Sequence, residues 1–202
     1  MYYFRIDMRQ FLLLALLWIS CRAYSDDLAL NQSDDNWRIV KNGFLFSAEF
    51  ECKKGEETIS KVIRTGTIRY HYYLFDASDE LQATGITRAF SWGAIVGSAM
   101  EIDVWEGDFY LGKIEGDISS FFAPKFTLYD CLGNKAVVAH MSSEFYEFAI
   151  VSAQDEAKRV ADLQFLGNGC EWGWEMKMKE PIPQIDPRIL RIFAAFVADY
   201  LP

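Results

Sequence analysis

Clustered positive charge is missing from this sequence. The formal net charge is −9, and no run of Lys or Arg is longer than two residues. A surface that tracks a phosphate backbone needs clustered Lys and Arg, so we predict that the protein does not bind nucleic acid. The same acidity argues against broad adhesion to anionic lipid surfaces. It leaves room for a small local basic pocket.

Cysteine and histidine are also scarce, with four and two residues. The cysteines are isolated from one another, at Cys21, Cys52, Cys131 and Cys170. No Cys-x-x-Cys pair provides the spacing of a zinc site. His71 and His140 each stand alone, which is typical of ordinary strand or surface histidines. We therefore predict no metal site and no cofactor.

The N-terminus has the pattern of an export signal. Arg5 and Arg9 precede an uninterrupted apolar run, residues 11–19. A short basic region followed by an apolar stretch of about 7–15 residues is typical of a signal peptide. The run is shorter than the roughly 20 residues that span a bilayer as a helix. The alternative, a buried N-terminal helix without a polar face, would need a large partner surface.

Two processing sites compete within this segment. Cleavage after Ala23 defines residues 1–23 as the signal peptide and residues 24–36 as a flexible, acidic lead-in. Alternatively, Trp18-Ile-Ser-Cys21 resembles a degenerate lipoprotein box, and Cys21 would receive the lipid. Cleavage after Ala23 would leave an odd number of cysteines, so at most one intramolecular disulfide could form among them. An exported protein would be secreted, periplasmic or attached to an envelope, and the pairing stays open.

Residues 37–202 are predicted to form a single, mainly β domain. Hydrophobic residues make up 51% of the chain, enough for a core, and the 16% of aromatic residues suits pleated, half-buried surfaces. Short apolar alternations are separated by turn residues, which indicates an antiparallel sandwich or barrel. The expected turns are at residues 53–56, 79–80, 106–108, 132–134 and 154–155, and the last expected strand is residues 172–178.

The C-terminus departs from this pattern. Asp186 and Pro187 are typical of a helix start, with Asp as the N-cap. In residues 188–201, Arg188, Arg191 and Asp199 fall on one narrow stripe, and the remaining circumference is apolar apart from Tyr200. Such a helix must be buried on nearly every side, and it is too short to span a membrane. We therefore predict a closed antiparallel β-barrel wrapped around a hydrophobic C-terminal helix, with no transmembrane span in the mature chain.

Three segments carry a resemblance to a known family. They are Phe126-Thr-Leu-Tyr-Asp-Cys-Leu-Gly-Asn-Lys-Ala-Val-Val-Ala139, Glu101-Ile-Asp-Val-Trp-Glu-Gly-Asp-Phe-Tyr-Leu-Gly-Lys-Ile114 and Ile185-Asp-Pro-Arg-Ile-Leu-Arg-Ile-Phe-Ala-Ala-Phe-Val-Ala-Asp199. With them, the chain from Trp37 onward resembles the tubby C-terminal-like superfamily, in its LURP-one-related and phospholipid-scramblase-like branch. The resemblance implies a closed β-barrel threaded by a hydrophobic helix. No motif matches the phosphoinositide-contacting basic residues of tubby proteins, so no binding residue is carried over.

Few residues suggest chemistry. Cys131 and His140 could pair across a hairpin as nucleophile and base, and Asp103 and Asp117 could act as paired carboxylates. Nothing in the sequence supplies an orienting third group for Cys131 and His140, so core or edge packing is the favoured interpretation. We interpret the two aspartates as parts of a strand face and a turn. We assign no catalytic, cofactor-binding or metal-binding residue.

Two further patterns have simpler explanations. The glycines at 93 and 97 are not followed by the Gly-Lys-Ser/Thr of a phosphate loop and fit a bulged strand or tight loop. Trp92, Trp105, Trp172 and Trp174 could line a ligand pocket, but core packing is the favoured interpretation.

Two functions remain from the sequence. The first is a non-enzymatic barrel that binds a lipid or a protein at an envelope or outside the cell. The second is a secreted hydrolase whose active site the sequence does not reveal. A core filled by the C-terminal helix would favour the first, and a clustered acid–base pair in a cleft would favour the second. The oligomeric state is left open.

Overall fold

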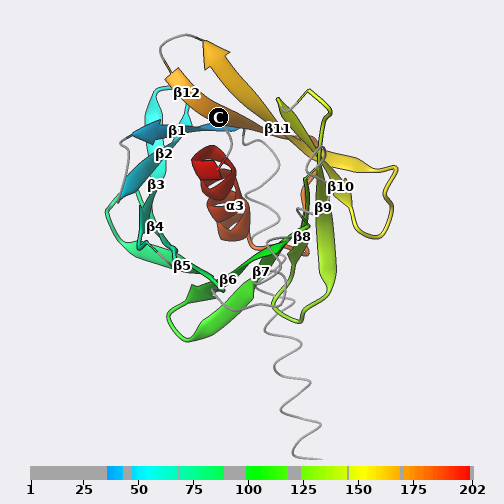
Figure 1. Ribbon diagram of the computed structural model, residues 1–202, viewed down its shortest axis with the longest axis horizontal. Helices are drawn as coiled ribbons and strands as arrows, with labels where there is room; N and C mark the ends of the chain where they lie inside the picture. The colour runs from blue at the N-terminus through cyan, green and yellow to red at the C-terminus, as the bar shows by residue number, and fades with distance from the viewer. Residues whose placement is uncertain are drawn as a thin grey trace, which may run out of the picture.

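A closed antiparallel barrel surrounds a single C-terminal helix. The computed structural model describes residues 36–42, 47–67, 69–88, 99–117, 124–144, 146–168 and 171–200. The predictions for the signal peptide and for the glycines at 93 and 97 lie outside these ranges. In the described part of the chain, Figure 1 shows the strands as a ring with the helix α3 inside it.

Every strand pairs antiparallel with its neighbours in the sequence, and β1 pairs with β12 to close the ring. The strands are β1 (Trp37–Asn42), β2 (Ala48–Lys54), β3 (Glu57–Thr65), β4 (His71–Asp76), β5 (Leu81–Thr87), β6 (Ala99–Glu106), β7 (Phe109–Asp117), β8 (Lys125–Tyr129), β9 (Lys135–Met141), β10 (Glu147–Ser152), β11 (Arg159–Asn168) and β12 (Glu171–Met178). Closure leaves no strand edge without a partner in this meander.

Alternating burial sets the inner and outer faces of the wall. In β8 the side chains of Phe126 and Leu128 are buried, and those of Thr127 and Tyr129 are only half-buried. Successive side chains of a strand point to opposite faces of a sheet, so the apolar positions line the lumen. The alternation read from the sequence therefore predicts the correct face for these residues.

The helix α3 (Pro187–Tyr200) occupies the lumen. Asp186 caps it, because its Oδ1 accepts a hydrogen bond of 2.9 Å from the backbone N–H of Arg188. Ile189, Ile192, Phe193 and Val197 have no exposed surface. Together with the buried Leu190, Ala194, Ala195 and Ala198, these positions point around the whole circumference of the helix, so the prediction of a helix wrapped by the sheet is confirmed.

Aromatic side chains from the wall and the helix interlock at the centre of the barrel. The ring of Phe193 lies 5.5 Å from that of Phe126 and 5.9 Å from that of Phe148, measured between centroids. Phe196 also contacts Phe126, at 5.5 Å. Trp174 joins the same cluster through Phe148, at 5.8 Å. Edge-to-face rings at these distances make the helix part of the core.

The two ends of the barrel differ in their connections. At one end, which we call the hairpin end, the turns β2–β3, β4–β5, β6–β7, β8–β9 and β10–β11 meet the start of α3. The opposite end, the loop end, has the other ends of these strands and the last turn of α3. The turn at Gly133 illustrates the hairpin end: its φ of 81° favours glycine, and its N–H donates to the carbonyl of Asp130 at 3.1 Å.

The turns expected at residues 79–80, 106–108, 132–134 and 154–155 all lie in or beside hairpins of the barrel, and the last strand is also confirmed. One strand was not assigned from the sequence. Trp37–Asn42 forms β1, which pairs with both β2 and β12. Nothing in its local sequence identifies those two partners, so the strand that closes the barrel is known only from the tertiary structure.

Candidate functional site

The structure separates Cys131 from His140. Cys131 is exposed in the β8–β9 turn, whereas His140 lies near the far end of β9, opposite Lys125 and Ala149. The segment from the start of β9 at Lys135 to His140 alone spans about 16 Å at roughly 3.3 Å per residue. The two side chains are therefore too far apart to act as a nucleophile and base. This agrees with their interpretation as ordinary structural residues.

The carboxylates of Asp103 and Asp117 are not a pair either. In the β6–β7 hairpin, Asp103 stands opposite Lys113, and Asp117 stands opposite Ala99 at the other end of β6. Asp103 instead binds Arg88, whose Nε and Nη2 lie 2.5 and 2.7 Å from the two carboxylate oxygens. A carboxylate bound through both oxygens by a guanidinium group forms a strong bidentate ion pair, so Asp103 is not half of a carboxylate pair.

The tryptophans divide between the core and the surface. Trp174 is 1% exposed and belongs to the core, as predicted. For Trp172 the prediction of core packing is wrong, because this side chain is 61% exposed. Both residues have the same strand parity, but Trp172 stands opposite Gly167 near the start of β12, two residues closer to the loop end of the barrel than Trp174. Trp105 is half-buried against Tyr110, with ring centroids 5.0 Å apart, and Trp92 lies outside the described residues.

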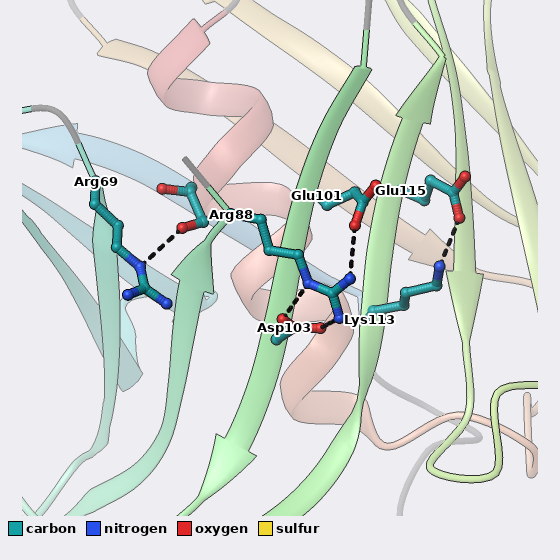
Figure 2. Close-up of polar contacts among 7 residues, drawn as sticks. Arg69, Arg88, Glu101, Asp103, Lys113 and Glu115 are labelled. Atoms are coloured by element: carbon teal, nitrogen blue, oxygen red, sulfur yellow. Dashed lines mark hydrogen bonds and ion pairs between the residues drawn. The ribbon is translucent and has the colours of Figure 1, made fainter. Parts of the chain in front are cut away.

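Charged residues form a ladder on the outer face of β5 to β7. Figure 2 shows it in front of the strands, with α3 behind them. Arg88 bridges Asp103 and Glu101, with an Nη1–Oε2 distance of 2.9 Å to Glu101. Lys113 binds Glu115 at 2.8 Å and lies 4.4 Å above the centre of the Tyr129 ring. The two cations are thus paired with three carboxylates along the sheet and offset most of their charge.

The electrostatics of this ladder do not suit acid–base catalysis. Burial, followed by the neighbouring Glu115 carboxylate, raises the pKa of Tyr129 to about 12. Burial and Asp103 raise the pKa of Tyr110 to about 12 in the same way. The hydrogen bond from Lys113 lowers the pKa of Glu115. A general acid or base works best with a pKa near the operating pH, and these shifts lead away from neutrality.

The rim beside the ladder is fixed by hydrogen bonds between β4 and β5. Arg69 Nε donates to the carbonyl oxygen of Thr87 at 3.1 Å. The Thr87 hydroxyl accepts from the N–H of Tyr70 at 2.8 Å and lies 3.2 Å from the Tyr70 carbonyl. These bonds tie the ends of the two strands together.

The polar stripe of α3 is matched by polar residues of the inner wall. The carboxylate of Asp199 lies 2.8 Å from Arg64 Nε and 3.1 Å from Lys41 Nζ, and the Tyr72 hydroxyl donates to it at 3.4 Å. A carboxylate near a helix C-terminus is unfavourable by itself, because that end of the helix dipole is negative. The cations of Arg64 and Lys41 therefore compensate both the Asp199 carboxylate and the helix dipole. We interpret the cluster as a buried lock that fixes the end of the helix.

The other end of the stripe has a similar arrangement. Arg188 binds Asp186 at 2.8 Å and Glu106 at 3.1 Å and donates to the carbonyl of Gln82 at 3.0 Å. These contacts attach the first turn of α3 to β5 and to the β6–β7 hairpin. The stripe is visible in the sequence, but the partners of Arg188 are not, because Glu106 and Gln82 lie 82 and 106 residues away from it in the chain.

Cys52 is the buried thiol of the inner wall. It is not exposed, forms no disulfide and stands opposite Ser60 in the β2–β3 pairing. Burial raises its pKa to about 11, although Ser60 and the charge of Arg191 oppose the rise. The reactive form of a cysteine is the thiolate, so Cys52 is not a nucleophile at neutral pH.

A small cleft opens at the hairpin end, between β9, β10, β11 and the segment before α3. Its volume is about 290 Å³, and Ser152, Asp155 and Lys158 contribute its polar groups. Each has a local role: the Ser152 hydroxyl accepts from the N–H of Gln154, and Asp155 accepts from the N–H of Ala157. Lys158 pairs with Glu180. No nucleophile and base come together among these described residues.

Large exposed apolar side chains gather at the two ends of the barrel. In the described part of the chain they are Leu81, Phe109 and Leu132 at the hairpin end and Tyr146, Trp172 and Tyr200 at the loop end. Leu81, Phe109 and Leu132, which we call the apolar tips, belong to three successive hairpins. Their exposures are 51%, 76% and 67%. Exposed positions in or beside a turn are usually polar, so these three are the surface residues that most need an explanation.

No protein-family model matches the sequence, and no curated protein matches it significantly. The resemblance to the tubby C-terminal-like superfamily therefore stays a prediction. Among the described residues, no three His, Cys, Asp or Glu side chains come together as a metal site. Within the same ranges, no helix has the length and apolar character needed to cross a membrane.

Proposed function

We propose that this chain is an exported, non-enzymatic β-barrel module of the tubby-like type, which binds a lipid or protein partner through its outer surface. The observation that carries the proposal is the occupied lumen. In eight-stranded ligand-binding barrels such as lipocalins the interior holds the ligand, whereas here α3 fills it with side chains such as Phe193 and Ile192, neither of which is exposed. A partner would then bind to the outer surface of the barrel.

Further support comes from the sequence. The architecture of a closed barrel around a C-terminal helix is the one that the family resemblance implies. Arg5, Arg9 and the apolar run that follows them support export. The alternative function, a secreted hydrolase, has less support, because the described clusters that hold Asp103, His140 and Ser152 lack a nucleophile, base and orienting group in contact.

A paired screen tests the proposal. The purified mature protein is assayed on ester, peptide, glycoside and phosphate substrates, and in parallel for partition onto neutral and anionic vesicles and for peptide binding. We expect no turnover, together with binding to at least one vesicle or peptide. Turnover that a single substitution at Cys131, His140 or Asp103 abolishes would overturn the proposal and establish the hydrolase.

A further inference from the structure

We propose that the apolar tips form a docking surface for a protein segment that is both basic and apolar. The inference rests on the proposed function, since it names the surface and the partner class of the binding module. It is carried by the position of the tips, their rigidity and the charges beside them.

The apolar tips are close neighbours around the rim. Strand β5, which begins with Leu81, pairs with β6, and β7, which begins with Phe109, pairs with both β6 and β8. Leu132 lies in the turn that follows β8. With strands about 4.8 Å apart, the row from Leu81 to Leu132 spans about 15 Å. This is about the length of three helical turns, so one short segment can contact all of the tips.

The tips are held rigidly by hydrogen bonds within their turns. Asp76 Oδ1 accepts from the N–H groups of Ser78 and Glu80, at 2.8 and 3.0 Å. Asp130 does the same in the β8–β9 turn, where the N–H of Leu132 donates to it at 2.9 Å. The β6–β7 hairpin is tied to the helix by the Arg188–Glu106 contact. A surface ordered before binding avoids part of the entropic cost of association.

Carboxylates flank every tip. Glu80 directly precedes Leu81, Asp108 directly precedes Phe109, and Asp130 lies two residues before Leu132. Nearby Asp79 is paired with Lys61. The exposed side chains of Glu80 and Asp108, in contrast, have no hydrogen bond or ion pair within the described ranges.

This combination of charge and apolar surface selects the partner. Uncompensated carboxylates beside the apolar side chains oppose contact with an anionic membrane and attract Lys and Arg. Apolar anchors surrounded by polar groups are the usual anatomy of a protein interface. Because the row is much smaller than the roughly 800 Å² per partner of a standard interface, we expect a transient, salt-sensitive complex.

The first test removes the apolar anchors without changing the charge. The probe is a fluorescent amphipathic peptide of about 14 residues composed of Lys and Leu, and its binding to the folded protein is followed by anisotropy. We expect Phe109→Ser together with Leu132→Ser to weaken binding at least about tenfold. Trp172→Ser, which alters another largely exposed aromatic residue, at the loop end, is the matched control and should leave the affinity unchanged.

The second test removes charge without removing apolar surface. Glu80→Gln together with Asp108→Asn should weaken binding about three- to tenfold at low salt and reduce its salt dependence. The control is Glu144→Gln together with Glu156→Gln, which removes the same charge from exposed positions elsewhere. Circular dichroism melts of all variants confirm that the barrel stays folded.

The outcomes separate this inference from the proposed function. If the tip variants bind the peptide as the unaltered protein does, or if only Trp172→Ser abolishes binding, the docking surface is wrong but the binding module stands. The docking-surface proposal is also wrong if the unaltered protein does not bind the peptide, or if the protein partitions onto vesicles through the same tips. Absence of all binding together with substrate turnover would reject the proposed function itself.

Discussion

Truncating Phe193 tests whether α3 is the structural centre of the barrel. This side chain has no exposed surface and contacts the rings of Phe126 and Phe148. Phe193→Ala removes a ring from the middle of an aromatic cluster to which both the wall and the helix contribute. The surrounding strands are fixed by pairing on both sides, so we expect the cavity to collapse only in part.

The expected loss is large compared with the stability of a domain. Truncating a buried Phe to Ala typically costs about 3–5 kcal/mol, including the cavity, out of roughly 5–15 kcal/mol for a whole domain. For a domain of this size, each kcal/mol corresponds to about 2–4 °C in Tm, so the melting temperature should fall by about 6–20 °C. Adding Phe196→Ala should leave the protein largely unfolded. The two losses should not be additive, because both rings contact Phe126.

Urea and thermal unfolding followed by circular dichroism provide the measurement. Phe109→Ala is the matched control, since it makes the same chemical change at a position that is 76% exposed. We expect this control to lie within about 0.5 kcal/mol of the unaltered protein.

A loss below about 1 kcal/mol for Phe193→Ala would refute the reasoning. The same is true if the Phe193→Ala and Phe196→Ala double variant stays folded while losing affinity for membranes. That result would mean that the helix serves as an anchor and that the barrel does not depend on it.

Three further predictions concern other parts of the chain. Asp199→Ala removes the carboxylate that pairs with the buried Arg64 and should lower the free energy of unfolding in urea by about 3–5 kcal/mol. Adding Arg64→Met should restore part of that stability, because no buried charge is then left unpaired. An unchanged urea midpoint for Asp199→Ala would show that the buried lock contributes nothing to stability. Cys52, with a pKa raised to about 11, stays protonated at pH 7–8. Mass spectrometry after maleimide treatment should therefore find Cys52 modified only in the urea-unfolded protein, and rapid labelling of the native protein would contradict this. The exported protein should begin near Tyr24 or at a lipidated Cys21, and intact Met1 in the exported fraction would rule out the cleaved signal.

Much of the local structure followed from the sequence because it is encoded over a few residues. The hairpin turns at Gly107 and Gly133 combine glycine with acidic or amide residues, and the Asp186 cap needs only the N–H two residues later. The apolar circumference of residues 188–201 required burial, and a β-rich chain offered the lumen of a barrel as the place for it. No local pattern revealed a site, because the cysteine, histidine and aspartate pairs considered were separated by strand register.

What the tertiary structure decided is which distant segments meet. The alternation in Trp37–Asn42 fixes which side chains face inward, but only closure of the ring brings this strand between β2 and β12. Asp199 was visible as a polar residue on an apolar helix, while its partners Lys41 and Arg64 come from strands at the other end of the sequence. Likewise, Leu81, Phe109 and Leu132 are unrelated positions in the sequence and become one surface because successive hairpins turn at the same end of the barrel. Local sequence determines the conformation of each strand and turn, whereas the neighbours of each strand depend on the packing of the whole chain around α3.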